Sequence, residues 1–195
     1  MYVLTVDQRG SRRYADAVPA LLTDLNAAYA DLLVLPFERT AGDEVQGLLS
    51  RADVVVDLAV ELVRRSAWSV GIGVGETEDP LPDSVRAGRG EAYVLARASV
   101  ERAKSAPHPV CVGARRPEAA GHAEAACWLL AGVLARRTAA GWEAVDAMET
   151  HERQVDAADA LGITPQAMSR RLRVAGWTEE RRGRTLAAYL LQEAS

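Results

Sequence analysis

Two turns in the N-terminal third of the sequence place carboxylates beside small and basic residues. Asp7 ends a β-rich run, and Asp43 stands at the tip of an expected hairpin, in the turn Ala41 to Glu44. If the first strand and the hairpin strand are neighbours in one sheet, the two aspartates come close together. Paired carboxylates at such a place suit Mg²⁺, a hard cation that binds carboxylates together with substrate phosphates. The sequence therefore predicts a magnesium site at this edge of the sheet.

The same region offers groups that bind anions. A basic stretch with a glycine and a serine, residues 8–13, follows Asp7, and we expect it to lead into a helix from about Tyr14 to Tyr29, whose N-terminus favours anions. Two further cations lie seven residues apart, on one face of an expected helix that starts at Gly90. The predicted nucleotide-binding residues are Gly10, Ser11, Arg12, Gly42, Arg97 and Lys104.

A purely structural interpretation of the same residues is the alternative. Asp7 then caps the turn that follows it, and Asp43 suits the hairpin turn. Glu44 pairs with Arg12 or Arg97, and the cations of the later helix form a solvated face. The three histidines and two cysteines show no spacing typical of a zinc site, which needs clustered nitrogen and sulfur ligands.

Near the C-terminus the sequence has the pattern of a helix-turn-helix, over about residues 152–175. Ala158 is small, as a close helix crossing requires, and Gly162 supplies the turn. Thr164 is a good N-cap, and Pro165 stands at the first helical position, where no N–H is needed. The outer face of the second helix then carries groups that contact base edges and phosphates in a major groove. The predicted DNA-binding residues are Thr164, Gln166, Ser169, Arg170 and Arg173.

Charge supports this interpretation. The whole chain has a net charge of −4, yet residues 164–184 hold six arginines against two glutamates, a local charge of +4. The positive field therefore coincides with the helix-turn-helix. A helical hairpin with a solvated arginine face is the alternative.

Alternating strand and helix patterns must position the first group of residues. Their order, β-α-β-β-α-β, is that of a ferredoxin-like unit, so an α/β (α+β) fold is expected. Gly71 and Gly73 lie inside an expected strand, where they indicate close backbone packing. Four tryptophans are expected to anchor the core. The expected strands are 2–6, 32–38, 44–48, 68–74 and 109–112, and the expected helices are 14–29, 52–65 and 90–105.

The composition changes at about residue 114, after which only helices are expected, over about 118–138, 141–149, 152–160, 165–175 and 178–192. We therefore expect two domains, an α/β domain over 1–113 and a helical region over 114–195. The helix 118–138 carries two apolar stripes, Ala125-Leu129-Val133 and Ala126-Leu130-Leu134, and so broad an apolar face must be buried. It packs on the sheet or forms the seam of a homodimer.

Composition excludes several classes of protein. The chain of 195 residues is 49% hydrophobic, enough for a real core, and it has no apolar run near the ~20 residues that a membrane span needs. No signal peptide is expected at the N-terminus, and two cysteines do not build a disulfide framework. The expected location is cytoplasmic, with no membrane partner.

Residues 2–105 also resemble a known family. The segments Leu4-Thr-Val-Asp7-Gln-Arg-Gly-Ser-Arg12, Phe37 to Leu49, Gly71-Ile-Gly-Val-Gly75 and Gly90 to Lys104 are similar, in order, to the bacterial SatD family. That family resembles class III nucleotidyl cyclases and GGDEF-type cyclases, which have a ferredoxin-like palm. The resemblance implies that Asp7 and Asp43 are metal ligands and that Glu44 matches the glutamate of the GGDEF signature.

The departures from the cyclase pattern bear on activity. Tyr93 stands where cyclases carry an asparagine, four residues before the helical arginine, so we expect binding without turnover. The expected function is DNA binding, as a transcriptional regulator whose degenerate cyclase-like domain senses a nucleotide or serves assembly. The alternative is a Mg²⁺-dependent nucleotide-binding or nucleotidyl cyclase-type enzyme.

Overall fold

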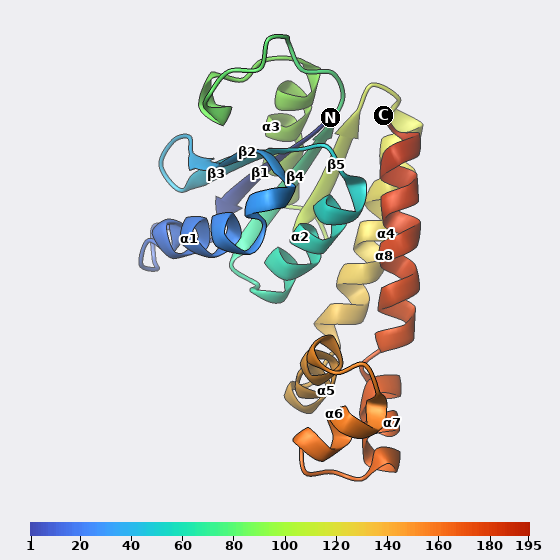
Figure 1. Ribbon diagram of the computed structural model, residues 1–195. Coiled ribbons are helices and arrows are strands. Elements are labelled where there is room, and N and C mark those ends of the chain that lie inside the picture. The colour runs from blue at the N-terminus through green and yellow to red at the C-terminus, as the bar shows by residue number, and fades with distance from the viewer.

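A mixed five-stranded sheet organises the first 114 residues (Figure 1). The computed structural model describes residues 1–195 and gives the strand order β2-β3-β1-β4-β5. All neighbouring strands are antiparallel except β4 and β5, which are parallel. The fold therefore has the α/β character that the sequence predicts. The strands are β1 (Tyr2–Gln8), β2 (Leu33–Arg39), β3 (Glu44–Leu49), β4 (Trp68–Val74) and β5 (Val110–Ala114).

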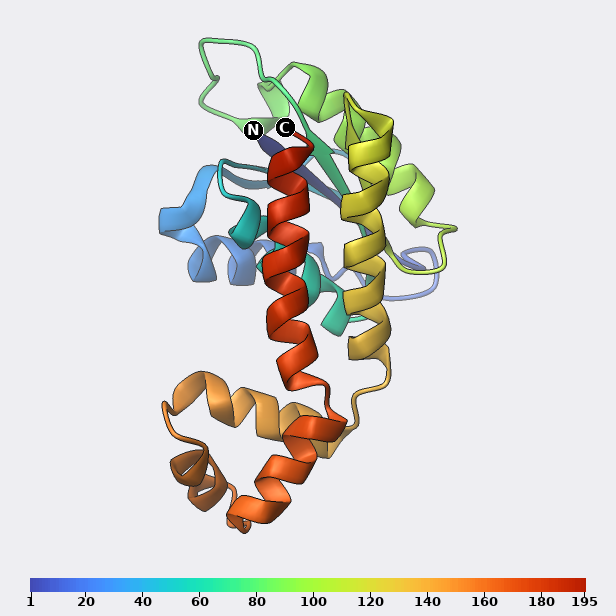
Figure 2. The same cartoon turned by 90° about the vertical axis from the view of Figure 1, so that its right-hand side faces the viewer.

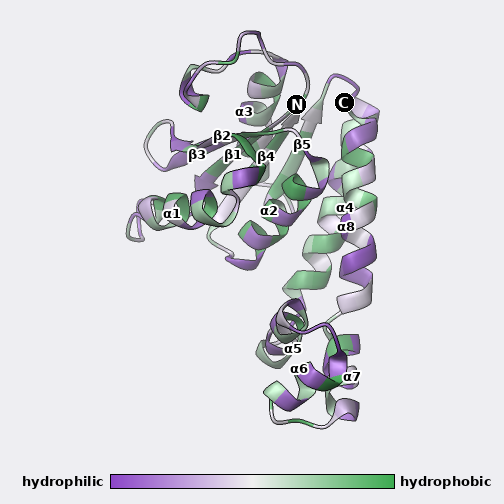
Figure 3. Ribbon diagram, in the orientation of Figure 1, coloured by the Kyte–Doolittle hydropathy of each residue, from purple (hydrophilic) through white to green (hydrophobic).

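Helices cover both faces of this sheet (Figure 1). Helices α1 (Val18–Ala28) and α2 (Ala52–Arg64) lie on one face, where they share a core with Leu4, Val6 and Ile72. Helix α3 (Glu91–Ala103) lies on the other face and packs with Val3 and Leu48. Strands β4 and β5 and helix α2 are largely hydrophobic (Figure 3), because both faces of this part of the sheet are covered.

Two glycines in β4 allow α3 to approach the sheet closely. A Cβ on Gly71 would lie 2.2 Å from the backbone nitrogen of Val100, and one on Gly73 would lie 2.0 Å from the carbonyl oxygen of Ala92. Any side chain at these positions would push α3 away from the sheet. The prediction of close backbone packing at these glycines is confirmed.

The first helix starts later than the sequence predicts. Residues 9–14 form turns, and α1 begins at Val18 instead of near Tyr14. Side chains fix this start, because the Gln8 side-chain oxygen accepts from the Ala17 N–H at 2.9 Å and Asp16 accepts from the Val18 N–H at 3.0 Å. Single-turn 3₁₀ helices precede β2 (Ala30–Leu32) and α3 (Val85–Ala87). All other predicted elements are present with boundaries shifted by a few residues.

Helices α4 (Pro117–Ala135) and α8 (Trp177–Glu193) run side by side along the sheet edge formed by β5 (Figures 1 and 2). The stripe Ala126-Leu130-Leu134 of α4 is buried in the same core as the strands, together with Ala187 and Leu191 of α8. The other stripe of α4 stays outside, and Leu129 is 72% exposed. One of the two predicted apolar stripes therefore packs on the sheet body.

Three short helices form a separate unit at the far end of the molecule (Figures 1 and 2). They are α5 (Ala139–Thr150), α6 (Gln154–Ala160) and α7 (Pro165–Val174), and they have their own small core around Ala157, Met168 and Leu172. The packing therefore groups the chain differently from the expected division at residue 114. Helices α4 and α8 belong to the sheet body, and residues 139–175 form the separate unit. No helix is both long and apolar enough to cross a membrane.

Candidate functional site

Helices α6 and α7 have the geometry of a helix-turn-helix. Gly162 adopts a φ of +63° in the turn between them, a conformation that glycine reaches at no steric cost. The Thr164 hydroxyl oxygen accepts from the Ala167 N–H at 3.2 Å and so caps α7, and Pro165 occupies its first turn. The local signals read from the sequence thus fix where α7 begins.

Packing of one face of α7 determines which side chains point outward. Met168 is fully buried, and Leu172 and Ala175 are 4% and 3% exposed. They pack against Ala157 and Ala158 of α6, which are also fully buried. Since neighbours on a helix face are three and four residues apart, the residues between them face solvent.

The predicted DNA-binding residues lie together on this outer face. Gln166, Ser169, Arg170 and Arg173 are exposed, and neither arginine forms an ion pair within the chain. The intervening Arg171 differs, because its Nη1 lies 3.1 Å from Glu143 of α5. Thr164 is exposed too, with its hydroxyl used for the cap. The two free guanidinium groups are therefore available to an external anion.

The second group of predicted residues lies where β1, β3 and α3 meet. Asp7 and Glu44 are register partners across β1 and β3. The Lys104 ammonium lies 3.0 Å from Asp7, and the Arg97 guanidinium lies 2.9 Å from Glu44. The two cations that the sequence places on one helix face thus each reach one carboxylate of the sheet.

Burial and charge set the state of these carboxylates. Burial raises the pKa of Asp7, the Lys104 ammonium partly offsets this, and the nearby Asp43 charge raises it further. Glu44 is 6% exposed and accepts a hydrogen bond of 2.5 Å from the Thr40 hydroxyl. Protein groups therefore compensate the Asp7 charge only in part, whereas Glu44 is held by Thr40 and Arg97.

This arrangement does not fit a resident magnesium ion. No three side chains of the Asp, Glu, His or Cys type come together anywhere in the chain. A divalent cation between Asp7 and Glu44 would also meet the positive charges of Lys104 and Arg97. The predicted ligand set of Asp7, Asp43 and Glu44 is divided, because Asp7 and Asp43 line a cleft and Glu44 does not.

That cleft has a volume of about 580 Å³ and lies beside Asp7. Four cationic side chains and two carboxylates line it, so its field favours an anion. The N-terminus of α1 does not add to the anion-binding groups of the cleft, because Gln8 and Asp16 already accept hydrogen bonds from backbone N–H groups at the start of this helix. Of the predicted nucleotide-binding residues, Gly10, Ser11, Arg12 and Lys104 line the cleft, whereas Gly42 and Arg97 do not.

The cysteines have the properties of core residues. Burial raises the pKa of the Cys111 thiol to about 11 and that of the Cys127 thiol to about 12. Both are free and buried. A thiol needs its thiolate form to act as a nucleophile or metal ligand, so neither cysteine contributes a reactive group.

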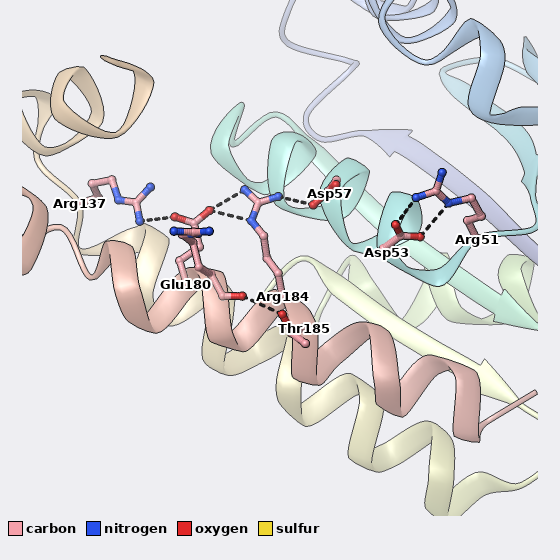
Figure 4. A network of polar contacts seen from close by, with 8 residues as sticks. Arg51, Asp53, Asp57, Arg137, Glu180, Arg184 and Thr185 are labelled. Carbon is pink, nitrogen blue, oxygen red and sulfur yellow. Dashed lines mark hydrogen bonds and ion pairs between the residues drawn. The ribbon is translucent and has the colours of Figure 1, made fainter. Parts of the chain in front are cut away.

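A third site was missed by sequence reasoning. Trp142 and Trp177, expected in the core, pack against its edge as partly buried residues and also line a cavity between the sheet body and the three-helix unit. Beside it, Arg137, Glu180, Arg184 and Asp57 form a chain of ion pairs (Figure 4). The only signal in the sequence is the position of the two tryptophans near the ends of the three-helix unit.

No family model, curated protein or solved structure matches this chain. Its function is therefore inferred from these three sites.

Proposed function

We propose that this protein binds DNA by inserting α7 into the major groove, and that it acts as a sequence-specific transcriptional regulator. The observation that carries the proposal is the outer face of α7, where Gln166, Ser169, Arg170 and Arg173 are exposed and the two arginines have no ion-pair partner. Amide and guanidinium groups form the bidentate contacts that distinguish adenine and guanine. The three-helix unit also extends beyond one end of the sheet body (Figure 2), which gives a duplex access to α7.

Substitutions on α7 test this proposal. Arg170→Ala and Arg173→Ala each remove a contact worth about 1–3 kcal/mol, so affinity for a duplex selected from a random pool should fall about 5- to 150-fold. Arg171→Ala is the matched control, because it removes the same charge from the same helix at a position turned toward Glu143. Affinity should also fall steeply as salt rises.

Two results would contradict DNA binding through α7. One is no retention of any duplex at low salt and high micromolar protein. The other is an equal loss of affinity in Arg170→Ala and Arg171→Ala, which would show that only total charge matters.

For the sheet body, we propose a ferredoxin-like fold related to the SatD family and the nucleotidyl cyclases. The strand order β2-β3-β1-β4 with intervening helices supports this assignment. We propose that the body senses a nucleotide without turning it over. The observation that favours nucleotide binding is the cleft beside Asp7, with Arg9, Arg12, Arg13 and Lys104 in its wall.

Thermal shifts with ATP and GTP test the nucleotide proposal. A ligand that binds only the native state raises the melting temperature, and here the rise should not require Mg²⁺, because the site supplies its own cations. Arg12→Gln should abolish the shift, whereas Arg97→Gln, outside the cleft, should not. Metal-dependent conversion of the nucleotide would favour the cyclase-type enzyme instead, and no shift at all would leave the body as a scaffold.

We also propose that the outer face of α4 and α8 pairs with a second copy of the chain. Leu129, Leu186 and Tyr189 on these adjacent helices are 72%, 50% and 55% exposed. One helix-turn-helix reads few base pairs, and two-fold symmetric proteins bind half-sites about 34 Å apart. Light scattering should give a dimer that Leu129→Glu dissociates. A clean monomer at about 100 µM would contradict pairing at the affinities typical of such proteins.

A further inference from the structure

A cavity of about 640 Å³ opens where the sheet body meets the three-helix unit. Its walls come from α2 of the sheet body, α5 of the three-helix unit and α8, which joins the two. It is separate from both the outer face of α7 and the cleft beside Asp7. Its size falls within the range of small-molecule sites, which are often found between domains.

Two tryptophan rings line the cavity, and each already holds a cation. The Arg64 guanidinium lies 4.2 Å from the centre of the Trp142 ring, and the Arg181 guanidinium lies 5.1 Å from that of Trp177. Both distances are within the range in which a cation is attracted to a ring face. The two guanidinium groups differ in their anchoring: Arg64 is held by two hydrogen bonds to Asp146, whereas Arg181 is exposed and has no ion-pair partner. A ligand cation can therefore replace Arg181 on Trp177 without breaking an ion pair.

Charge in the cavity favours a cation. Five carboxylates and three guanidinium groups line it. Arg184 pairs with Asp57 and, together with the buried Arg137, with Glu180. Glu61 pairs with Arg65, but Glu149 and Glu152 form no ion pair. Burial, followed by the nearby Asp146 charge, raises the pKa of Glu149. The positive charge of a bound cation would offset this rise, because it favours the charged form of the carboxylate.

The wall of the cavity is connected to the end of α7. Arg137, whose side chain is fully buried, donates to the Ala175 carbonyl oxygen at 3.0 Å. It also donates to Glu180 at 2.5 Å (Figure 4). Glu180 in turn binds Arg184, which reaches Asp57 of α2 at 2.7 Å. One guanidinium nitrogen of Arg137, Nη1, is buried without a partner. The residue that follows α7 is thus linked to the sheet body through side chains that lie in or directly behind this cavity.

We propose that the cavity binds a small organic cation, an amidinium or amine on a flat apolar body, and that this ligand controls DNA binding by fixing the three-helix unit against the sheet body. The flat body stacks on Trp177 in place of Arg181, and the charge is neutralised by Glu149 and Glu152. Such a ligand contacts both parts at once, so it favours the arrangement in which the cavity is formed. The control of DNA binding by this ligand rests on the proposed function, whereas ligand binding in the cavity does not.

Three probes of similar shape test ligand binding: benzamidinium, neutral benzamide and anionic benzoate. Benzamidinium alone should quench tryptophan fluorescence saturably and raise the melting temperature. The double variant Glu149→Gln/Glu152→Gln should weaken benzamidinium binding about tenfold or more. Trp177→Leu should remove the saturable quenching of tryptophan fluorescence by benzamidinium. Glu193→Gln, an exposed glutamate at the far end of α8, is the matched control and should change nothing.

Three outcomes would overturn the site: equal binding of benzamide and benzamidinium, preference for benzoate, or no saturable binding up to about 10 mM. Regulation is tested by the affinity for DNA with and without saturating benzamidinium. An unchanged DNA affinity, with ligand binding intact, would overturn the control of DNA binding by this ligand. A protein that binds benzamidinium but never DNA would instead contradict the proposed function and leave the site standing.

Discussion

The buried pair of Arg137 and Glu180 should be the most sensitive point at the junction of the two parts. Their side chains are 0% and 4% exposed, and their atoms approach to 2.5 Å. Glu180→Gln keeps the shape and a neutral acceptor oxygen but leaves the Arg137 charge buried without a counter-charge, beside the Ala175 carbonyl oxygen and the Trp142 ring. Breaking such a pair from one side costs about 3–5 kcal/mol, or roughly 6 to 20 °C in melting temperature for a chain of this size.

Thermal and urea unfolding measure this loss, with Glu179→Gln as the control. Glu179 precedes Glu180 on the same turn of α8 but is exposed and forms no ion pair, so its variant should shift the free energy of unfolding by less than about 0.5 kcal/mol. The double variant Arg137→Met/Glu180→Leu should recover most of the loss, because it removes both charges from the interior. Equal shifts for Glu179→Gln and Glu180→Gln would show that burying the unpaired Arg137 charge carries no cost.

Three further predictions concern the sheet body. Because burial raises the pKa of Asp7, the native state disfavours its charged form, so stability from this group is present below its ordinary pKa and is lost as the pH rises. The free energy of unfolding of Asp7→Asn, measured in urea, should therefore rise relative to that of the parent protein between about pH 3 and about pH 7. A difference between the two proteins that does not change with pH would contradict this. Gly73→Ala should destabilise the protein by about 1–3 kcal/mol or more through the clash with α3. Gly121→Ala, whose added Cβ has nothing within 4 Å, should stabilise it by up to about 1 kcal/mol. Equal melting temperatures of the two variants would show that α3 can move away from the sheet at no cost. Cys127, with a pKa of about 12, should react with a disulfide reagent only when the chain unfolds, and rapid labelling of the native protein would refute its burial.

Local sequence patterns predicted most of the strands and helices, including the pair α6 and α7. Strand 68–74 was predicted with the observed bounds, and α7 starts where Thr164 and Pro165 indicate. These signals are local: a cap, a turn glycine and a hydrophobic period act within a few residues of one another, so they need no knowledge of the rest of the chain. The start of α1 was missed because the side chain of Gln8, nine residues before Ala17, helps to fix it.

Which side chains meet depends on how the helices and strands pack. Asp7 and Asp43 suggested a metal site, but α3 brings Lys104 against Asp7, a contact between residues far apart in the sequence. The chain of ion pairs at the junction likewise joins Arg184 to Asp57, 127 residues away. The charge state of a carboxylate depends on burial and on every charge nearby, and both follow from the packing of whole elements. The same packing placed α4 and α8 in the core of the sheet body and opened the cavity beside Trp142 and Trp177, because the burial of an apolar stripe depends on which surface it meets.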